Sequence, residues 1–504
     1  MRKTEYQLVN TFPKLAWVTM IDEEKDRLEV FYGQYVEQHM DWFVEGIWDG
    51  PFEKGEFHET DLIFGTGMRL DGDKIVFVSS SSMADRLYYL PHQKKLIVSN
   101  SLPCLMAFTD YDLDPIKDYT KFFQNLHKCN GKYERELSAR GSRETIFNIL
   151  GDNLVYLSGK AEVEIKPKKK HFSDFDSLNK FIDEAFLKFK NNWESPVRKH
   201  KLLTFSTIST GYDSTAVSFF ASRAGCKCFF NCISSAAIGP GILRTKRKKC
   251  DDGGKIAEYM GAKCIKFDRQ DFQRDLSNEI YLFPGMPNTR LTIFLPMINY
   301  LDQLNGPSVL FTGIGGDYAW GSDPGDLGYD CGAISLSEIR LKAGFIHCAF
   351  LSWFSQFREL LLEISRSEDM KRWRLREGYD RPVPRRILEE GGIPGSEFGS
   401  VKKGAWNRLR VPMRPFDPQL RKSYYKFLTD NNLCSNWKIA CFPVMSALFL
   451  SYWTLKIIVS FLLNKVGVKV HVNKTTSPFS RLAHSTFPWS VKLIADEYRI
   501  IMMK

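Results

Sequence analysis

The chain has 504 residues, a formal net charge of +11, 43% apolar residues and 26% charged residues. These values are ordinary for a soluble globular protein of two or three domains and exclude a chain too short to bury a core. The positive charge favours an anionic partner, such as a nucleotide, an acidic glycan, a nucleic acid or a membrane surface, without choosing among them.

The cysteines and the start of the chain bear on its location. The 11 cysteines show neither a disulfide framework nor zinc-finger spacing, which is typical of reduced thiols in a cytoplasm. The opening residues, MRKTEYQLVN, contain no apolar signal region, so we expect a cytoplasmic protein.

Residues 1–165 have the alternating, β-branched and aromatic pattern of strands. A helix is predicted at 102–108. The predicted strands are 17–20, 28–32, 74–78, 86–90, 96–99, 151–157 and 161–165. The basic run KPKKK at 166–170 follows, and we place a domain boundary there because a charge run containing Pro makes a poor core element.

From residue 171 onward, strands alternate with helices. Helices are predicted at 172–193, 215–224 and 253–260. Strands are predicted at 202–208, 227–233, 263–267 and 309–311. This alternation predicts a parallel sheet with helices on both faces, in which a ligand binds at the carboxyl ends of the strands.

The turn STGYDST at 209–215 follows the first of these strands. Such a turn directs backbone N–H groups and a helix N-terminus at one point, which indicates a phosphate-sized anion site. The candidate binding residues are Ser209, Thr210, Gly211, Asp213, Ser214 and Thr215. The alternative is an ordinary strand–turn–helix junction capped by Ser or Asp.

A second glycine-rich turn, TGIGGD at 312–317, follows the strand at 309–311. Its candidate residues are Gly313, Gly315, Gly316 and Asp317. Because both turns follow strands of one parallel sheet, we expect them to face the same site.

Both turns carry a resemblance to the asparagine synthetase family. The first is similar to the pyrophosphate loop Ser-Gly-Gly-x-Asp-Ser, with Thr210 in place of the first Gly. The second, FTGIGGDYAWG at 311–321, resembles Ser-Gly-x-Gly-Gly-Asp-Glu-x-x-Gly. A third stretch, from 384 to 403, is similar to the late lysine region of that family. The resemblance covers roughly 170–420.

The resemblance implies an α/β fold with two domains. Residues 171–504 would form a parallel-sheet ATP-binding synthetase domain of the pyrophosphate-loop type. Residues 1–165 would form a mostly β, N-terminal-nucleophile-hydrolase-like α+β sandwich, on the likeness of ADRLYYL at 84–90 to the glutamine-hydrolysing domain. That domain needs an N-terminal Cys, whereas this chain has Arg2 and Lys3, so we expect no glutaminase activity.

The activity implied is amide formation by way of an acyl-AMP, with ATP and Mg²⁺ required and pyrophosphate released. The substrate would be a small-molecule, sugar-acid or peptide carboxylate, and the co-substrate an amine or ammonia. Asp213 and Asp317 would hold Mg²⁺, and Lys402 or Lys403 would stabilise phosphate charge. Ile314 stands where relatives carry a Glu or Tyr that handles the amine, so a base would come from elsewhere.

Two other functions stay open, a tRNA- or nucleobase-modifying enzyme and an inactive nucleotide-binding scaffold. We expect no nucleic-acid partner and no membrane attachment, and a homodimer is left open. The apolar stretch at 440–463 is expected to be a buried core helix, with attachment to a membrane surface as its alternative. Arg385 and Arg386 are expected on a solvated face, and His347 as a packed residue.

Overall fold

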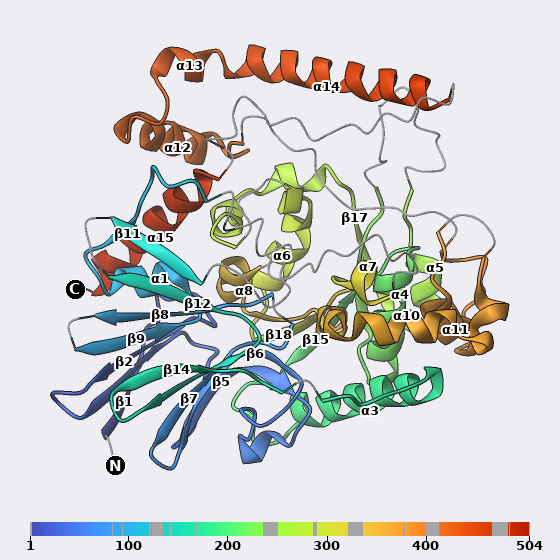
Figure 1. Cartoon of the computed structure of the whole chain (residues 1–504), viewed down its shortest axis with the longest axis horizontal. Coiled ribbons are helices and arrows are strands. Elements are labelled where there is room, and N and C mark those ends of the chain that lie inside the picture. The colour runs from blue at the N-terminus through green and yellow to red at the C-terminus, as the bar shows by residue number, and fades with distance from the viewer. Residues whose placement is uncertain are drawn as a thin grey trace.

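Three β-sheets organise the chain into a mixed α/β structure (Figure 1). The structure is a computed structural model that describes residues 3–82, 84–92, 94–119, 122, 135–140, 144–167, 169–234, 250–285, 290–320, 336–375, 379–399, 413–465, 482 and 484–502. Two sheets are rich in antiparallel strands and lie in the first third of the chain, and a separate third sheet is wholly parallel.

The first sheet has eight strands in the order β1-β3-β2-β9-β8-β12-β11-β10, and only β1 and β3 pair in parallel. Its strands are β1 (Lys3–Leu8), β2 (Trp17–Asp22), β3 (Arg27–Tyr32), β8 (Leu87–His92), β9 (Lys95–Ser99), β10 (Asp112–Leu113), β11 (Glu136–Arg140) and β12 (Thr145–Ile149). The second sheet has six strands in the order β14-β13-β7-β6-β5-β4. They are β4 (Glu37–Gln38), β5 (Trp42–Trp48), β6 (Ile63–Asp71), β7 (Lys74–Val78), β13 (Asn153–Leu157) and β14 (Lys160–Glu164).

The two sheets stack through an apolar core. Trp17 of the first sheet contacts two rings of the second, Phe43 with ring centroids 5.0 Å apart and Phe77 at 6.1 Å. All the strands predicted in this part of the chain are confirmed within a few residues, whereas β1, β4, β5, β6, β10, β11 and β12 were missed. All seven residues of β5 are buried, including Glu45, so this strand lacks the polar–apolar alternation that predicts an exposed sheet face.

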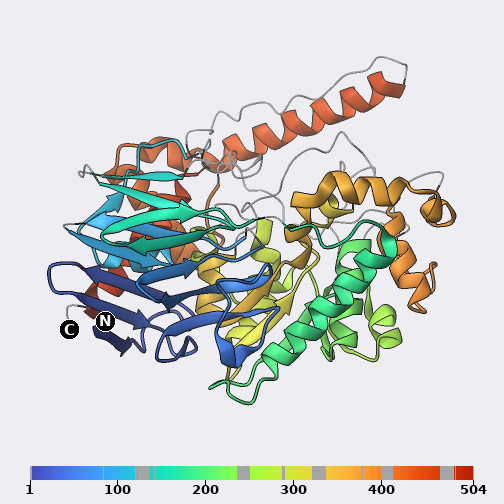
Figure 2. The same cartoon turned by 60° about the horizontal axis from the view of Figure 1, so that its bottom comes forward.

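The parallel sheet has five strands in the order β17-β16-β15-β18-β19. They are β15 (Leu203–Thr207), β16 (Cys228–Cys232), β17 (Lys263–Phe267), β18 (Ser308–Phe311) and β19 (Phe345–Cys348). Helices cover both of its faces, as the alternating pattern predicts (Figures 1 and 2). The helices are α1 (Leu102–Ala107), α3 (Phe175–Trp193), α4 (Tyr212–Arg223), α5 (Gly254–Tyr259), α6 (Leu295–Asp302), α7 (Gly316–Ala319), α8 (Ser337–Ala343), α9 (Phe350–Phe354), α10 (Arg358–Arg366), α11 (Pro382–Glu390), α12 (Pro418–Asp430), α13 (Asn436–Ala440), α14 (Phe442–Lys465) and α15 (Thr486–Met502).

Neighbouring residues of each parallel strand pack into different cores. On β18, Val309 and Phe311 join the core that contains α3 and α4, whereas Leu310 joins the core that contains α6. Phe229 and Phe230 of β16 divide in the same way. Strands that are buried on both faces read as continuous apolar runs, which is why β16 and β18 were recognisable from the sequence. The short edge strand β19 was missed, although all four of its residues are buried.

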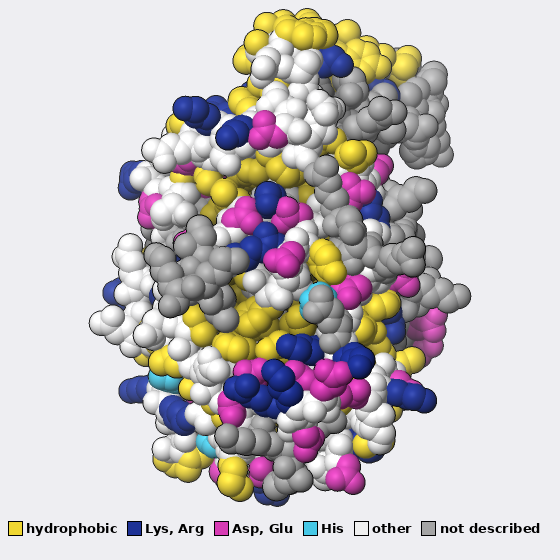
Figure 3. Space-filling view, turned by 90° about the vertical axis from the view of Figure 1, so that its left-hand side faces the viewer, with side chains coloured by type: hydrophobic (Ala, Val, Ile, Leu, Met, Phe, Trp, Pro, Cys, Tyr) yellow, Lys and Arg dark blue, Asp and Glu magenta, His cyan; other side chains and the backbone are white. Residues whose placement is uncertain are grey.

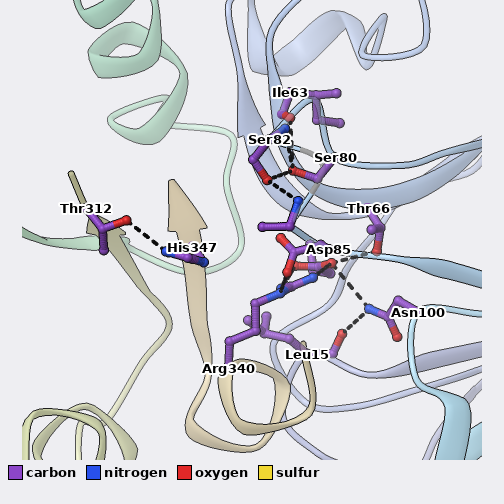
Figure 4. A network of polar contacts seen from close by, with 12 residues as sticks. Leu15, Ile63, Thr66, Ser80, Ser82, Asp85, Asn100, Thr312, Arg340 and His347 are labelled. Carbon is purple, nitrogen blue, oxygen red and sulfur yellow. Dashed lines mark hydrogen bonds and ion pairs between the residues drawn. The ribbon is translucent and has the colours of Figure 1, made fainter. Parts of the chain in front are cut away.

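A buried polar network joins the first half of the chain to α8 (Figure 4). Arg340 of α8 is bonded to Glu45 of β5 and to Asp85, each at 2.7 Å, and all three side chains are at most 1% exposed. Glu45 also accepts hydrogen bonds from Thr66 at 2.6 Å and Asn100 at 3.3 Å. Two residues before Arg340, Glu338 accepts from the Ser101 hydroxyl at 2.9 Å. These contacts fix α8 against the antiparallel sheets.

The last two long helices differ in how they pack. α15 packs against the antiparallel-sheet region, residues 3–164, where Lys492 pairs with Asp112 at 2.7 Å. α14 lies along the outer edge of the molecule (Figure 1) and carries exposed Val, Leu and Tyr side chains, so the expectation of a buried core helix at 440–463 is wrong. In the part of the chain that the structure describes, we find no helix with the length and apolarity needed to cross a bilayer.

Candidate active site

The strand order of the parallel sheet defines a crevice between β15 and β18. The chain adds β16 and β17 on one side of β15, then reverses and adds β18 and β19 on the other. In open parallel sheets, ligands bind at this reversal, outside the carboxyl ends of the strands. The two turns predicted from the sequence, 209–215 and 312–317, leave the sheet at this point.

The first turn is shorter than predicted, because α4 begins at Tyr212. Asp213, Ser214 and Thr215 therefore lie in the first helical turn, where backbone N–H groups have no partner within the helix. The residue that caps α4 is Gly211, and no side chain accepts a capping hydrogen bond there. Asp213 is thus not the N-cap, and the simple capping interpretation of this carboxylate is excluded.

Hydroxyl groups converge beside the start of α4. The Ser209 and Ser214 hydroxyls share a hydrogen bond of 2.6 Å, and the Gly211 N–H donates to Ser209 Oγ at 3.0 Å. The buried Thr215 hydroxyl donates to the Ser209 carbonyl at 2.8 Å. Ser209 and Ser214 are only partly buried, so their hydroxyls can turn toward a ligand.

Thr210 supports the turn. Its N–H and its hydroxyl both donate to Asp251 Oδ1, at 2.8 and 2.7 Å. Its carbonyl accepts from the Gly399 N–H at 2.9 Å. The N–H of Thr210 therefore supports the turn and does not face a ligand, because Asp251 accepts its hydrogen bond.

The second turn contacts the first directly. A Cβ on Gly313 would lie 2.4 Å from the Ser214 backbone nitrogen, and one on Gly316 would lie 2.2 Å from Asp213 Cγ. Gly315 has a φ of +89°, which disfavours any residue with a side chain. The structure therefore brings the two predicted turns together, and the glycines permit backbone-to-backbone contact.

Two carboxylates and one arginine meet at this contact. Arg381 Nη2 donates to Asp317 Oδ1 at 3.0 Å, and the Tyr379 hydroxyl lies 3.4 Å from Asp213 Oδ2. The Arg381 side chain is 8% exposed, whereas that of Asp317 is 45% exposed. Arg381 Nε is buried and has no hydrogen-bond partner among the described residues. A buried cation with an unused donor, beside an accessible carboxylate, is suited to an anionic ligand.

The electrostatics of Tyr379 and Arg381 follow from this crowding. Burial first, and then the charge of Asp213, raise the pKa of Tyr379 far above its ordinary value. The phenol therefore stays protonated and acts as a hydrogen-bond donor. Burial acts to lower the pKa of Arg381, but Tyr379, Asp213 and Asp317 more than offset it, so the pKa is raised.

Sequence reasoning missed Tyr379 and Arg381, although they directly precede the stretch at 384–403 that carried part of the resemblance. α11 brings them to the site by packing on α4. On α11, Arg385 donates to the Tyr212 hydroxyl and pairs with Glu389 at 2.9 Å. Its side chain is 11% exposed, so the solvated-face expectation is wrong for Arg385.

His347 and the predicted lysines complete the set of candidates. His347 is fully buried and shares a hydrogen bond of 2.9 Å with the Thr312 hydroxyl (Figure 4). Burial and then the Arg340 charge lower the pKa of His347 to about 3, so its ring is neutral. Lys402 and Lys403 lie outside the described residues.

A Mg²⁺ ion at this site would need further ligands from a bound phosphate compound and from water. Among the described residues, no group of three or more His, Cys, Asp or Glu side chains is placed to hold a metal ion. Mg²⁺ in phosphate-transfer sites is commonly held by one or two carboxylates plus substrate phosphates and water. Asp213 and Asp317, on the two touching turns, supply that number of carboxylates.

The chain matches none of the protein-family models searched, and no curated protein matches it.

Proposed function

We propose that the chain is an ATP-dependent, AMP-forming amide ligase of the asparagine synthetase type. It would activate a carboxylate as an acyl-AMP, release pyrophosphate, and transfer the acyl group to an amine. The observation that carries the proposal is the contact between the turns at 209–215 and 312–317, which brings one carboxylate from each turn together with the buried Arg381 at the crevice of the parallel sheet.

The pyrophosphate part of ATP would bind at the start of α4. The Ser209 and Ser214 hydroxyls, which bond to each other at 2.6 Å, would exchange that bond for bonds to phosphate oxygens. The N–H groups of the first helical turn, which have no partner within the helix, and the positive end of the α4 dipole favour an anion at the same place. The Thr210–Asp251 bonds would keep the turn in shape while the serines rearrange.

Asp213 and Asp317 are the residues that would hold Mg²⁺, which supplies charge neutralisation to the leaving pyrophosphate. Arg381 now pairs with Asp317 at 3.0 Å and would turn toward a phosphate oxygen once a cation takes its place. A planar guanidinium can hold two oxygens at once, which orients the phosphate as well as neutralising it.

Within this proposal, the residue that accepts a proton from the amine is not Tyr379. Its raised pKa keeps the phenol protonated, so it can position Asp213 but cannot act as a base.

The first region fits the proposal as a glutaminase-like domain. Its two stacked antiparallel sheets have the layering of an N-terminal-nucleophile-hydrolase sandwich. Part of its surface is joined to the parallel-sheet region through Arg340, Glu45 and Asp85, so this region would act as a fixed support for the ligase site.

Exchange of labelled pyrophosphate into ATP tests the proposal. We expect exchange that requires both Mg²⁺ and a carboxylic acid found by screening a panel of sugar acids, peptides and small acids. Asp213→Asn should reduce the rate by about 100-fold or more, the size of effect seen when one charge-stabilising group is removed. The matched control is Asp176→Asn, which alters the second residue of another helix, α3, and should leave exchange unchanged.

Two results would count against the ligase. If pyrophosphate and ATP fail to bind with Mg²⁺ present, the chain is an inactive scaffold with respect to this site. If exchange depends on added tRNA and on no acid, the nucleobase-modifying alternative replaces the ligase.

A further inference from the structure

α14 carries a stripe of exposed apolar side chains along its outer side. The helix lies at the edge of the molecule in both ribbon views, and Figure 3 shows hydrophobic side chains at the upper tip that α13 and α14 form. The exposed fractions run from 45% to 66%. The stripe residues are Val444, Leu448, Tyr452, Leu455, Val459 and Leu462.

The spacing of the stripe is that of a helix-pairing seam. Leu448, Leu455 and Leu462 recur every seven residues, and Tyr452 and Val459 fall between them, four residues after a Leu and three before the next. Leu at one seam position with a β-branched residue at the other favours two-stranded coiled coils, and Val459 with its neighbouring leucines fits this pattern. At about 100° per residue, the six side chains lie within an arc of roughly 80°.

The stripe faces away from the part of the chain that the structure describes. The buried residues of α14 include Phe442, which is 1% exposed, and Ser460, which is 6% exposed. Both lie about 120° around the helix from the centre of the stripe, by the same rotation per residue. A second helix can therefore reach the stripe without displacing the body of the molecule.

We propose that α14 pairs with α14 of a second copy of this chain as a parallel, in-register coiled coil. The same stripe serves both partners, as a two-fold interface requires. The charge pattern favours the parallel arrangement, because the position that faces Lys456 across such a pair is Ser451 of the other copy. No two lysines are then opposed along the described seam.

A lipid surface fits the stripe less well. Helices that lie on membranes bury a broad apolar face bordered by several Lys or Arg residues. The charged residues of α14 are only Lys456 and Lys465, so the stripe lacks the basic border that such helices carry. A seam of this width matches the groove of one partner helix.

The size of the stripe sets the strength of the pairing. A helix of 24 residues is about 36 Å long and about 10 Å wide, so a third of its surface presents on the order of 400 Å². Two copies would bury about 800 Å² in total, less than the roughly 1,600 Å² of a standard stable interface. We therefore expect a reversible dimer with a dissociation constant in the micromolar range.

Sedimentation equilibrium of the full chain, from about 1 to about 100 µM, tests the pairing. The wild-type chain should pass from monomer to dimer across this range. The triple variant Leu448→Glu/Leu455→Glu/Leu462→Glu should dimerise at least 100-fold more weakly. The control Leu187→Glu, which alters a 57% exposed Leu on α3, should dimerise like the wild type. Because the altered side chains are exposed, all the variants should keep the wild-type unfolding midpoint.

Cysteine cross-linking tests the arrangement. Leu448→Cys should cross-link to itself in the parallel pair, above the background of the cysteines already present. In an antiparallel pair it would instead cross-link to a chain carrying Leu462→Cys, and that result would overturn the parallel arrangement. A wild-type chain that stays monomeric throughout would overturn the pairing. So would a monomer that binds phosphatidylserine vesicles through the same three leucines, because the stripe would then be a lipid-binding face.

Discussion

Two places in the molecule combine one buried arginine with two carboxylates, yet they are suited to different tasks. Between the sheets, Arg340 pairs with Glu45 and Asp85, and all three side chains are at most 1% exposed. At the two turns, Arg381 faces Asp213 and Asp317, and Asp317 is 45% exposed. Both places hold one guanidinium and two carboxylates, and they differ in how far the carboxylates reach solvent.

This difference in solvent access explains why the Arg340 cluster stabilises the fold whereas the Arg381 cluster is suited to ligand binding. Charges that are closed off from water must satisfy one another, and removal of one leaves the rest buried and uncompensated. A carboxylate that reaches solvent can exchange its arginine for a cation at little cost. The predictions below disturb one place at a time.

The largest effect is expected from Arg340→Met. Loss of this guanidinium leaves Glu45 and Asp85 buried without their partner, which should cost about 3–5 kcal/mol. For a chain of this length, about 1 kcal/mol corresponds to about 1 °C in the unfolding midpoint, so the midpoint should fall by about 3–5 °C. Calorimetry checks this, with Lys342→Met on the same helix as a control that should change stability by less than about 0.5 kcal/mol. An unchanged midpoint in Arg340→Met would show that the network is not needed for stability.

Asp317→Asn should have the opposite consequence, a large loss of activity with little loss of stability. The pyrophosphate exchange rate should fall by about 100-fold or more, because one of the two metal-binding carboxylates is lost. Stability should change by less than about 1 kcal/mol, since the carboxylate is nearly half exposed. Pyrophosphate-exchange kinetics and calorimetry on the same sample measure the activity and the stability of this variant. A large loss of stability with a normal exchange rate would show that Asp317 is a structural residue and not part of the site.

The pH dependence of stability should reveal the contribution of Glu338. It lies beside the buried network, and burial raises its pKa from 4.5 to about 8. The folded chain therefore holds this proton more tightly than the unfolded chain, so stability should fall as pH rises from about 4.5 through 8. In Glu338→Gln this contribution is absent, and the difference in midpoint between pH 5 and pH 8 should shrink by about 2–4 °C. Equal pH profiles for the two proteins would refute a raised pKa at Glu338.

Arg381→Gln should give the smallest effect, and it should act in opposite directions on the affinities for pyrophosphate and for Mg²⁺. Pyrophosphate should bind about tenfold more weakly, because a charge-assisted donor is lost. Mg²⁺ alone should bind more tightly, because Arg381 no longer competes for Asp317. Calorimetric titrations measure both, and weakening of both ligands together would indicate a merely structural arginine.

The sequence predicted those parts of the structure that depend on local patterns. The runs at 227–233 and 309–311 are apolar on both faces, and the strands they predict lie at the centre of the parallel sheet. The two turns were recognisable because their glycines and hydroxyls are adjacent in sequence, and both adjoin the β15–β18 crevice.

What depends on packing between distant segments was not predictable. Arg381 lies 64 residues after Asp317 and reaches it only because α11 packs on α4. The burial of Glu45 likewise requires Arg340 from another part of the chain. Residues 440–463 are apolar enough for a core, and composition alone could not show that their large side chains form a stripe facing outward.

The central claim is that the turns at 209–215 and 312–317 together bind a magnesium-complexed phosphate chain. Titration of inorganic pyrophosphate into the full chain, with and without Mg²⁺, tests it most directly. We predict Mg²⁺-dependent binding that is lost in the double variant Asp213→Asn/Asp317→Asn while the unfolding midpoint is retained. Binding that is equally strong in the double variant, or no binding to the wild-type chain at any Mg²⁺ concentration, would contradict the account.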